Sequence, residues 1–159
     1  MGNFYEDVVR KDPRYYLSAR CADLSLLEPG TRSRVLAVLD EAASRRVHLA
    51  PYETYRSLSR QLLLYKHGAT KLRDVGVHHY ALAVDLVREV SGEPSWKGDF
   101  SILGELGRKH GLVWGGDWGE PDKHHSFVDA VHLQRVSVVD QGRLFAGSFY
   151  PDDAYDPYA

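Results

Sequence analysis

Two polar side chains interrupt apolar segments of the sequence. Asp85 lies inside the run over residues 81–87, and His132 lies between two aliphatic residues. Burying a carboxylate or an imidazole is unfavourable unless it is hydrogen-bonded, paired or bound to a metal. His78, seven residues before Asp85, completes a set of two imidazoles and one carboxylate. Three such ligands with one open position are typical of a catalytic zinc site.

A second carboxylate stands close to this set in the sequence. Asp129 precedes His132 by three residues. A carboxylate beside a metal-activated water can accept its proton and later pass it to a leaving amine. The residues for a metal-assisted amide hydrolase are therefore present. On spacing alone, a hydrogen-bonded core histidine and an ion-paired Asp85 are the commoner explanation.

Other histidines offer rival ligands. His124 and His125 follow Asp122 in a charge-rich loop without an apolar frame, which favours a solvated loop. His79 is expected to be exposed, because neighbouring side chains on an extended chain point in opposite directions. For Asp117, two interpretations stay open: it caps or turns its loop, or it orients a ligand histidine.

The composition narrows the class of protein. The 159 residues and 18.0 kDa suit one domain, expected over residues 1–150 with a core at about 31–138. The 20 basic and 22 acidic residues give a net charge of -2, which does not suggest a nucleic-acid or membrane-surface protein. Cys21 is the lone cysteine, so any metal ligands must be histidines and carboxylates. No apolar run reaches the ~20 residues of a membrane span, and the first residues lack the pattern of a secretory signal.

The surrounding pattern predicts a mixed α+β chain with a small antiparallel sheet flanked by helices. Helices are expected at 31–46 with Thr31 as N-cap, from Ser57 to Gly68 with Leu58, Leu62 and Tyr65 on one face, and from Asp99 to His110. Extended segments are expected at 47–55, 81–87, 112–114 and 131–139. Pro51 makes the first of these an edge or bulged strand. Residues 151–159 are expected to form a surface tail.

Four blocks carry a resemblance to a known family. They read Thr-Tyr-Arg-Ser at 54–57, Val-His-His-Tyr-Ala-Leu-Ala-Val-Asp-Leu at 77–86, Gly-Leu-Val-Trp-Gly-Gly-Asp-Trp at 111–118 and Phe-Val-Asp-Ala-Val-His-Leu-Gln at 127–134. In order and spacing, they resemble the zinc peptidases that include VanY-type D-alanyl-D-alanine carboxypeptidases and L-alanyl-D-glutamate endopeptidases of phage endolysins. The resemblance covers about residues 31–138.

The resemblance implies roles for particular residues. His78, Asp85 and His132 would bind one Zn²⁺ ion, and Asp129 would be the catalytic base. Arg56 would lie beside the site, where its planar guanidinium could hold a substrate carboxylate or carbonyl or stabilise the oxyanion. The alternative for Arg56 is a surface or core-edge ion pair. The further substrate-binding residues would be Gln61, supporting the site, and Trp114 and Trp118, which pack and wall the cleft.

Two positions depart from the family pattern of Ser-x-His-x-x-Gly-x-Ala-x-Asp. The family serine is Gly76 here, which removes a possible hydrogen bond behind the first ligand. The family glycine is Ala81, which adds a methyl group. Neither change removes a ligand or the base.

The implied substrate is the stem peptide of bacterial peptidoglycan. The Trp-Gly-Gly-Asp-Trp block and an aspartate at the base position favour cleavage of the L-alanyl-D-glutamate bond. The alternatives are a D-alanyl-D-alanine carboxypeptidase and a catalytically weak zinc-binding homologue that acts as a binding module. We expect a monomer without nucleic-acid or membrane partners, made in the cytoplasm and acting on the cell wall after release by a holin or by lysis.

Overall fold

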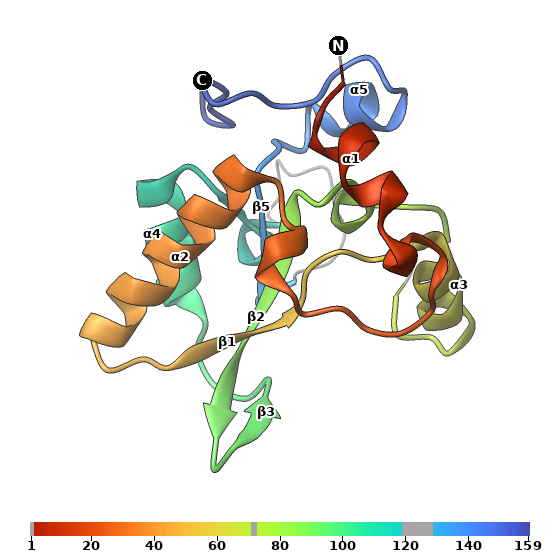
Figure 1. Cartoon of the computed structure of the whole chain (residues 1–159). Helices are drawn as coiled ribbons and strands as arrows, with labels where there is room; N and C mark the ends of the chain where they lie inside the picture. The colour runs from red at the N-terminus through yellow and green to blue at the C-terminus, as the bar shows by residue number, and fades with distance from the viewer. Residues whose placement is uncertain (1, 71–72, 119–128) are drawn as a thin grey trace.

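The fold is built on an antiparallel sheet that joins distant parts of the chain (Figure 1). The computed structural model describes residues 2–70, 73–118 and 129–159. The strands are β1 (Leu49–Glu53), β2 (Ala83–Val90), β3 (Glu93–Ser95), β4 (Val113–Trp114) and β5 (His132–Gln134). Their order is β1-β2-β5-β4, and β3 pairs with the far end of β2 as a hairpin. The expected small antiparallel sheet is confirmed.

Two helices cover one face of this sheet. Helices α2 (Pro29–Ser44) and α4 (Ser101–His110) lie side by side against it (Figure 1). Their apolar faces meet the strands in one buried cluster that includes Val35, Val38, Leu103, Leu106, Val84, Leu86 and Leu133. Burial of apolar surface is the main stabilising term in folding, so this layer fixes the sheet that carries the site.

The start of α2 differs from the prediction. The cap is Glu28, not Thr31, because the Glu28 carboxylate accepts the backbone N–H groups of Gly30 and Thr31. A glutamate rarely caps a helix in this way. Here Arg135, which is fully buried, holds the Glu28 carboxylate from the far end of the chain at 3.1 Å.

The predictions for the next two elements are largely confirmed. β1 lies at the sheet edge, and its register shifts between Pro51 and Glu53. Ser57 caps α3 (Leu58–Lys66), and Gly68 follows that helix with a left-handed φ of 75°. The apolar side chains of α3 are exposed, however, since the helix buries Gln61 instead: Leu58, Leu62 and Tyr65 are 46%, 43% and 45% exposed.

The end of the chain departs further from expectation. The strand predicted at 131–139 covers only His132–Gln134, because Arg135 turns inward to Glu28 and to the carbonyls of Asp152 and Tyr155. Helix α5 (Gln141–Phe145) follows. The remaining short elements are α1 (Phe4–Asp7) and the 3-10 turns η1 (Val9–Lys11), η2 (Pro13–Tyr16), η3 (Leu24–Leu26), η4 (Val77–Tyr80) and η5 (Gly115–Asp117).

The third predicted helix starts close to its expected cap. α4 begins at Ser101, and the Asp99 carboxylate accepts the Ser101 backbone N–H at 2.7 Å. Gly111 ends the helix with a φ of 78°.

Among the described residues, no helix combines the length and the apolar character that crossing a membrane requires.

Candidate metal centre

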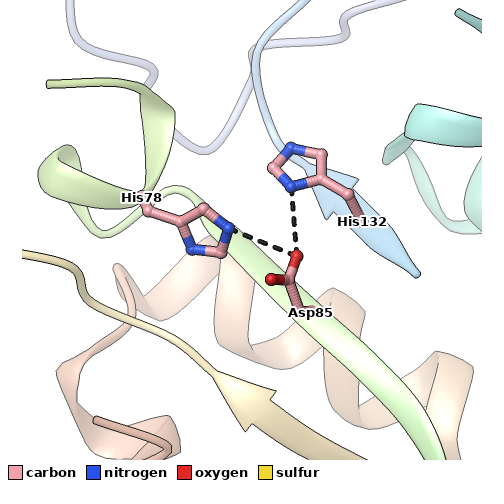
Figure 2. Close-up of side chains that lie close together, drawn as sticks. All are labelled: His78, Asp85 and His132. Atoms are coloured by element: carbon pink, nitrogen blue, oxygen red, sulfur yellow. Dashed lines mark hydrogen bonds and ion pairs between the residues drawn. The ribbon is translucent and has the colours of Figure 1, made fainter. Parts of the chain in front are cut away.

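Three side chains from three elements converge at one point of the sheet (Figure 2). Asp85 of β2 and His132 of β5 are direct partners in the antiparallel register. His78 approaches from the turn η4, just before β2. The Asp85 Oδ1 atom lies 3.3 Å from His78 Nε2 and 3.3 Å from His132 Nδ1. One ligand atom from each residue lies within 4.8 Å of the other two.

The outer nitrogen of each imidazole has its own acceptor. His78 Nδ1 lies 2.7 Å from the carbonyl oxygen of Thr54, and His132 Nε2 lies 2.8 Å from Gln134 Oε1. The Gln134 amide nitrogen donates to Val136 O and to Gln141 Oε1, which fixes the direction of that amide. The outer nitrogens therefore donate, so each ring in its neutral form has an inner lone pair free for a cation that it would share with the Asp85 carboxylate. Such outer partners are characteristic of metal-binding histidines, so these residues fit a divalent cation.

Charge and burial act together on the ionisable groups. Burial opposes ionisation of Asp85, but His78 and His132 outweigh it and hold the pKa of this carboxyl well below its usual range. Burial likewise opposes protonation of His132, while Asp85 and Asp129 raise the pKa of its imidazole overall. The site therefore keeps Asp85 as a carboxylate, which is the form that binds a metal.

Asp129 lies at the edge of the cluster. Its Oδ2 atom is 4.0 Å from His132 Nδ1, and its side chain is 38% exposed. Burial and the negative charge of Asp85 raise the pKa of Asp129, against the opposing effects of His132, His78 and Arg56. A carboxylate with a raised pKa near the ligands, and open to solvent, is suited to proton transfer.

Gly115 places Asp129, a role that the sequence reasoning missed. A Cβ atom on Gly115 would lie 2.3 Å from the carbonyl oxygen of Asp129 and 3.1 Å from the Cβ atom of His132. The Asp129 backbone N–H also donates to Gly115 O at 3.0 Å. The signal was the first glycine of the Trp-Gly-Gly-Asp-Trp block, which permits this close approach.

Arg56 reaches the same site from the loop after β1. Its guanidinium donates to Glu53 Oε1 at 2.9 Å and to Gln61 Oε1 at 3.1 Å, and lies 3.7 Å from Asp85 Oδ2. Gln61 thus contacts Arg56 from the first turns of α3. The Arg56 side chain is only 14% exposed, so Arg56 is not a surface residue.

Glu53 is the functional neighbour that the sequence reasoning did not name. It is 2% exposed, stands opposite Asp85 in the register and also accepts from Arg60 Nε at 3.0 Å. Two guanidinium groups, those of Arg56 and Arg60, therefore share one buried carboxylate opposite Asp85. An acid at a strand end followed by arginines three and seven residues later was the available signal.

The two predicted tryptophans lie differently. The Trp118 ring centroid is 4.9 Å from that of His132, and the residue is 7% exposed. Trp114 packs against Gly104 of α4, and its indole N–H donates to Ala130 O at 2.7 Å. Trp118 thus contacts the His132 ring, whereas Trp114 contacts both α4 and the segment between Asp129 and His132.

His79 is not exposed, contrary to the prediction. It is 6% exposed, bonds Tyr5 Oη at 2.8 Å and contacts Arg56 O at 3.2 Å. The alternation expected of an extended chain fails because His79 lies in the turn η4. Burial lowers the pKa of His79. Asp117 pairs with Arg108 of α4 at 2.9 Å.

The remaining predicted positions are the rival ligands and the two departures from the family pattern. Asp122, His124 and His125 lie outside the described residues. Ala81, the family glycine position, is fully buried with a left-handed φ of 63°, a conformation that costs a non-glycine residue roughly 1 kcal/mol. Gly76 precedes η4 and offers no side-chain cap to that turn.

Comparison with known proteins agrees with the geometry. No family model matches the chain. The peptidoglycan L-alanyl-D-glutamate endopeptidase CwlK of Bacillus subtilis (strain 168) is 27% identical over 129 residues, which are 69% of this chain and 74% of that protein. The L-Ala D-Glu endopeptidase ChiX of Serratia marcescens superposes with a TM-score of 0.56 at 22% identity, over 78% of this chain and 92% of that one.

This chain has the fold of these peptidases. The D,D-pentapeptidase VanY, solved in complex with Zn(II), superposes with a TM-score of 0.51 at 14% identity, over 76% of this chain and 78% of that one. The resemblance to VanY-like zinc peptidases, drawn from the four sequence blocks, is confirmed. The peptidase fold thus holds the His78, Asp85 and His132 cluster on β2, β5 and the turn before β2.

Proposed function

We propose that this protein is a zinc-dependent peptidase that cleaves peptidoglycan stem peptides at the L-alanyl-D-glutamate bond. One observation carries the proposal: His78, Asp85 and His132 converge with Asp129 beside them, in a chain similar to an L-alanyl-D-glutamate endopeptidase. His78, Asp85 and His132 would hold one zinc ion. The protein would act on the cell wall as a monomer.

The bound zinc, Asp129 and Arg56 would each have a separate role in the reaction. When bound, zinc supplies Lewis acidity that polarises the scissile carbonyl and activates water. Asp129 then takes a proton from the attacking water and delivers it to the leaving amine. Arg56, held by Glu53 and Gln61, presents its guanidinium to the substrate carboxylate or to the developing oxyanion.

A second candidate is a D-alanyl-D-alanine carboxypeptidase. The structural similarity to VanY favours it, and Arg56 could equally hold a terminal carboxylate. A catalytically weak zinc-binding homologue is the third candidate. The complete ligand set and Asp129 argue against it.

A muropeptide digest separates the three functions. Purified stem peptides are incubated with the zinc-loaded protein, with and without a chelator, and the products are identified by mass spectrometry. We expect chelator-sensitive cleavage between L-alanine and D-glutamate. Release of free alanine would identify the carboxypeptidase, and zinc binding without cleavage of any stem peptide would identify the binding module.

A further inference from the structure

A small hollow lies on the sheet, further along β1 and β2 from the candidate metal centre. It has a volume of about 170 Å³ and lies between β1, the β2–β3 hairpin and Arg20, which precedes η3. Its lining includes Arg20, Ala50, Tyr52, Val87, Glu89 and Pro94, and we call it the Tyr52 pocket. The proposed chemistry assigns it no role.

Tyr52, one of the lining residues, forms an aromatic pair with Trp96, which lies next to the lining. The Trp96 ring meets the Tyr52 ring edge-on, with centroids 4.7 Å apart. The Arg20 guanidinium lies 4.2 Å from the Tyr52 ring centroid and donates to the Tyr52 carbonyl at 2.6 Å. Trp96 nevertheless remains 49% exposed. A positioned, half-exposed ring next to charged side chains is a surface that suits a ligand with one apolar face and a polar edge.

The register places this pocket next to the ligands on one face of the sheet. Asp85, Val87 and Glu89 are every second residue of β2, so their side chains lie on the same face of the sheet. At ~3.3 Å per residue, Val87 and Glu89 lie roughly 7 and 13 Å from Asp85 along the strand. On β1, Ala50 pairs with Val87 and Glu53 with Asp85.

Arg56 lies on the other side of the ligands along the strands. The chain leaves β1 at Glu53 and runs on to α3, away from the β2–β3 hairpin (Figure 1), and Arg56 belongs to this connection. A substrate lying along the strands would therefore cross the metal ligands with the Arg56 guanidinium on one side and the Tyr52 pocket on the other.

We propose that the Tyr52 pocket binds the sugar ring to which the stem peptide is attached. This inference rests on the proposed function. In peptidoglycan, the L-alanine amine is joined to the lactyl group of an N-acetylmuramic acid residue. The sugar therefore lies one residue and one lactyl group before the L-alanyl-D-glutamate bond, roughly 7 Å along an extended chain. That span matches the distance from Asp85 to Val87.

The chemistry of the pocket suits a pyranose. Its C–H face would stack on the exposed Trp96 ring, and its hydroxyl and acetamido groups would meet Arg20 and Glu89. D-Glutamate, on the other side of the scissile bond, carries a free α-carboxylate that would face Arg56. A D-alanyl-D-alanine bond lies several residues further from the sugar, so this subsite favours the endopeptidase.

Two substrates that differ only in the sugar test this subsite. One is the free stem tetrapeptide, and the other is the same peptide on its N-acetylglucosaminyl–N-acetylmuramic acid disaccharide. We expect a lower KM for the sugar-bearing substrate with the wild-type protein. Trp96→Ala should raise that KM by roughly three- to tenfold, the range of one aromatic contact, and leave the KM for the free peptide unchanged.

Two further variants serve as controls. Trp96→Phe keeps a ring and should recover most of the preference. Leu36→Ala removes an exposed side chain from α2, in the helix layer on the other face, and should change neither KM. Equal cleavage of both substrates by the wild type, or an equal loss on both in Trp96→Ala, would overturn the subsite alone. Cleavage of neither substrate would overturn the proposed function itself.

Discussion

At the scale of the residue, each histidine of the candidate metal centre is held by a hydrogen-bond partner of its outer nitrogen. His132 has its inner nitrogen toward Asp85 because Gln134 accepts the hydrogen of its outer nitrogen. His78 is fixed in the same way by a backbone carbonyl, which no substitution can remove. Gln134 is therefore the position where this arrangement can be tested.

Gln134→Leu should weaken zinc binding while all three ligands remain. The Nε2 hydrogen of His132 loses its acceptor, so the imidazole is free to change tautomer and tilt. Loss of such a partner typically lowers metal affinity by about 10- to 100-fold. Competition with a chromophoric chelator measures the change. Gln141→Leu, which removes only a contact to the Gln134 amide, should have a smaller effect, and unchanged affinity in Gln134→Leu would contradict the assignment.

Asp129→Asn should abolish turnover and retain zinc. The amide preserves the shape but cannot accept a proton, so a loss of about 10²- to 10⁴-fold in kcat is expected.

In the wild type, activity needs the ionised carboxylate and falls as the pH drops through the pKa of Asp129. Because burial raises this pKa, the fall should begin above the usual range of an aspartate. Metal content and a pH–rate profile check both points; a variant with wild-type turnover would exclude Asp129 as the base.

At the scale of the element, the strands and the loop after β4 bring the site together. Asp85 and His132 could be predicted as site residues because each stands inside an apolar strand, where a polar side chain is unfavourable unless it has a partner. Their pairing across β2 and β5 is a matter of register, which the spacing alone does not determine. Glu53 and Gly115 were missed because their importance lies in contacts with Arg56 and Asp129, which depend on the tertiary arrangement.

The errors of prediction have the same origin. Thr31 looked like the helix cap because Arg135, distant in sequence, was not expected to hold Glu28. His79 looked exposed because the turn η4 was read as extended chain. Local pattern predicted the elements and most of their ends, including Ser57 and Gly68. It could not predict which buried charge meets which partner.

Gly115→Ala should disturb the loop that places Asp129. The new methyl group would overlap the Asp129 carbonyl, so the segment from Asp129 to His132 must move. We expect a loss of at least tenfold in kcat together with lower stability, because a shift of about 1 Å at a catalytic group can cost 10²-fold. Gly142→Ala in α5, where a Cβ atom meets no described atom within 4 Å, is the matched control. Activity at the wild-type level in Gly115→Ala would show that the loop adapts.

At the scale of the whole molecule, the last residues close back onto the sheet. Arg135 donates to the carbonyls of Asp152 and Tyr155, and the Tyr158 hydroxyl donates to Leu112 O at 2.7 Å. Leu112 directly precedes β4, which pairs with the strand of His132. Residues 151–159 thus contact both the buried Arg135 and the chain leading into the site's sheet.

The contribution of the Tyr158 hydroxyl to folding stability should depend on pH in the alkaline range. Burial raises the pKa of Tyr158 to about 12, against about 10 for an unfolded tyrosine. A raised pKa means that the folded state favours the neutral phenol. Its contribution is therefore complete below pH ~10 and is lost as the pH rises toward ~12. Tyr158→Phe removes this contribution, so its stability should depend less on pH in that window.

Urea unfolding at a series of pH values measures this difference. At neutral pH, Tyr158→Phe should lose no more than about 1 kcal/mol, the net value of one hydrogen bond on a half-exposed residue. The gap to the wild type should narrow from pH ~10 upward, because deprotonation of the unfolded wild-type chain then opposes folding. Tyr16→Phe, at a position that is 76% exposed, should run parallel to the wild type throughout. A constant gap between Tyr158→Phe and the wild type across that range would show that the phenol of Tyr158 titrates alike in the folded and unfolded chains, and the Tyr158 hydroxyl would then not anchor the tail to Leu112.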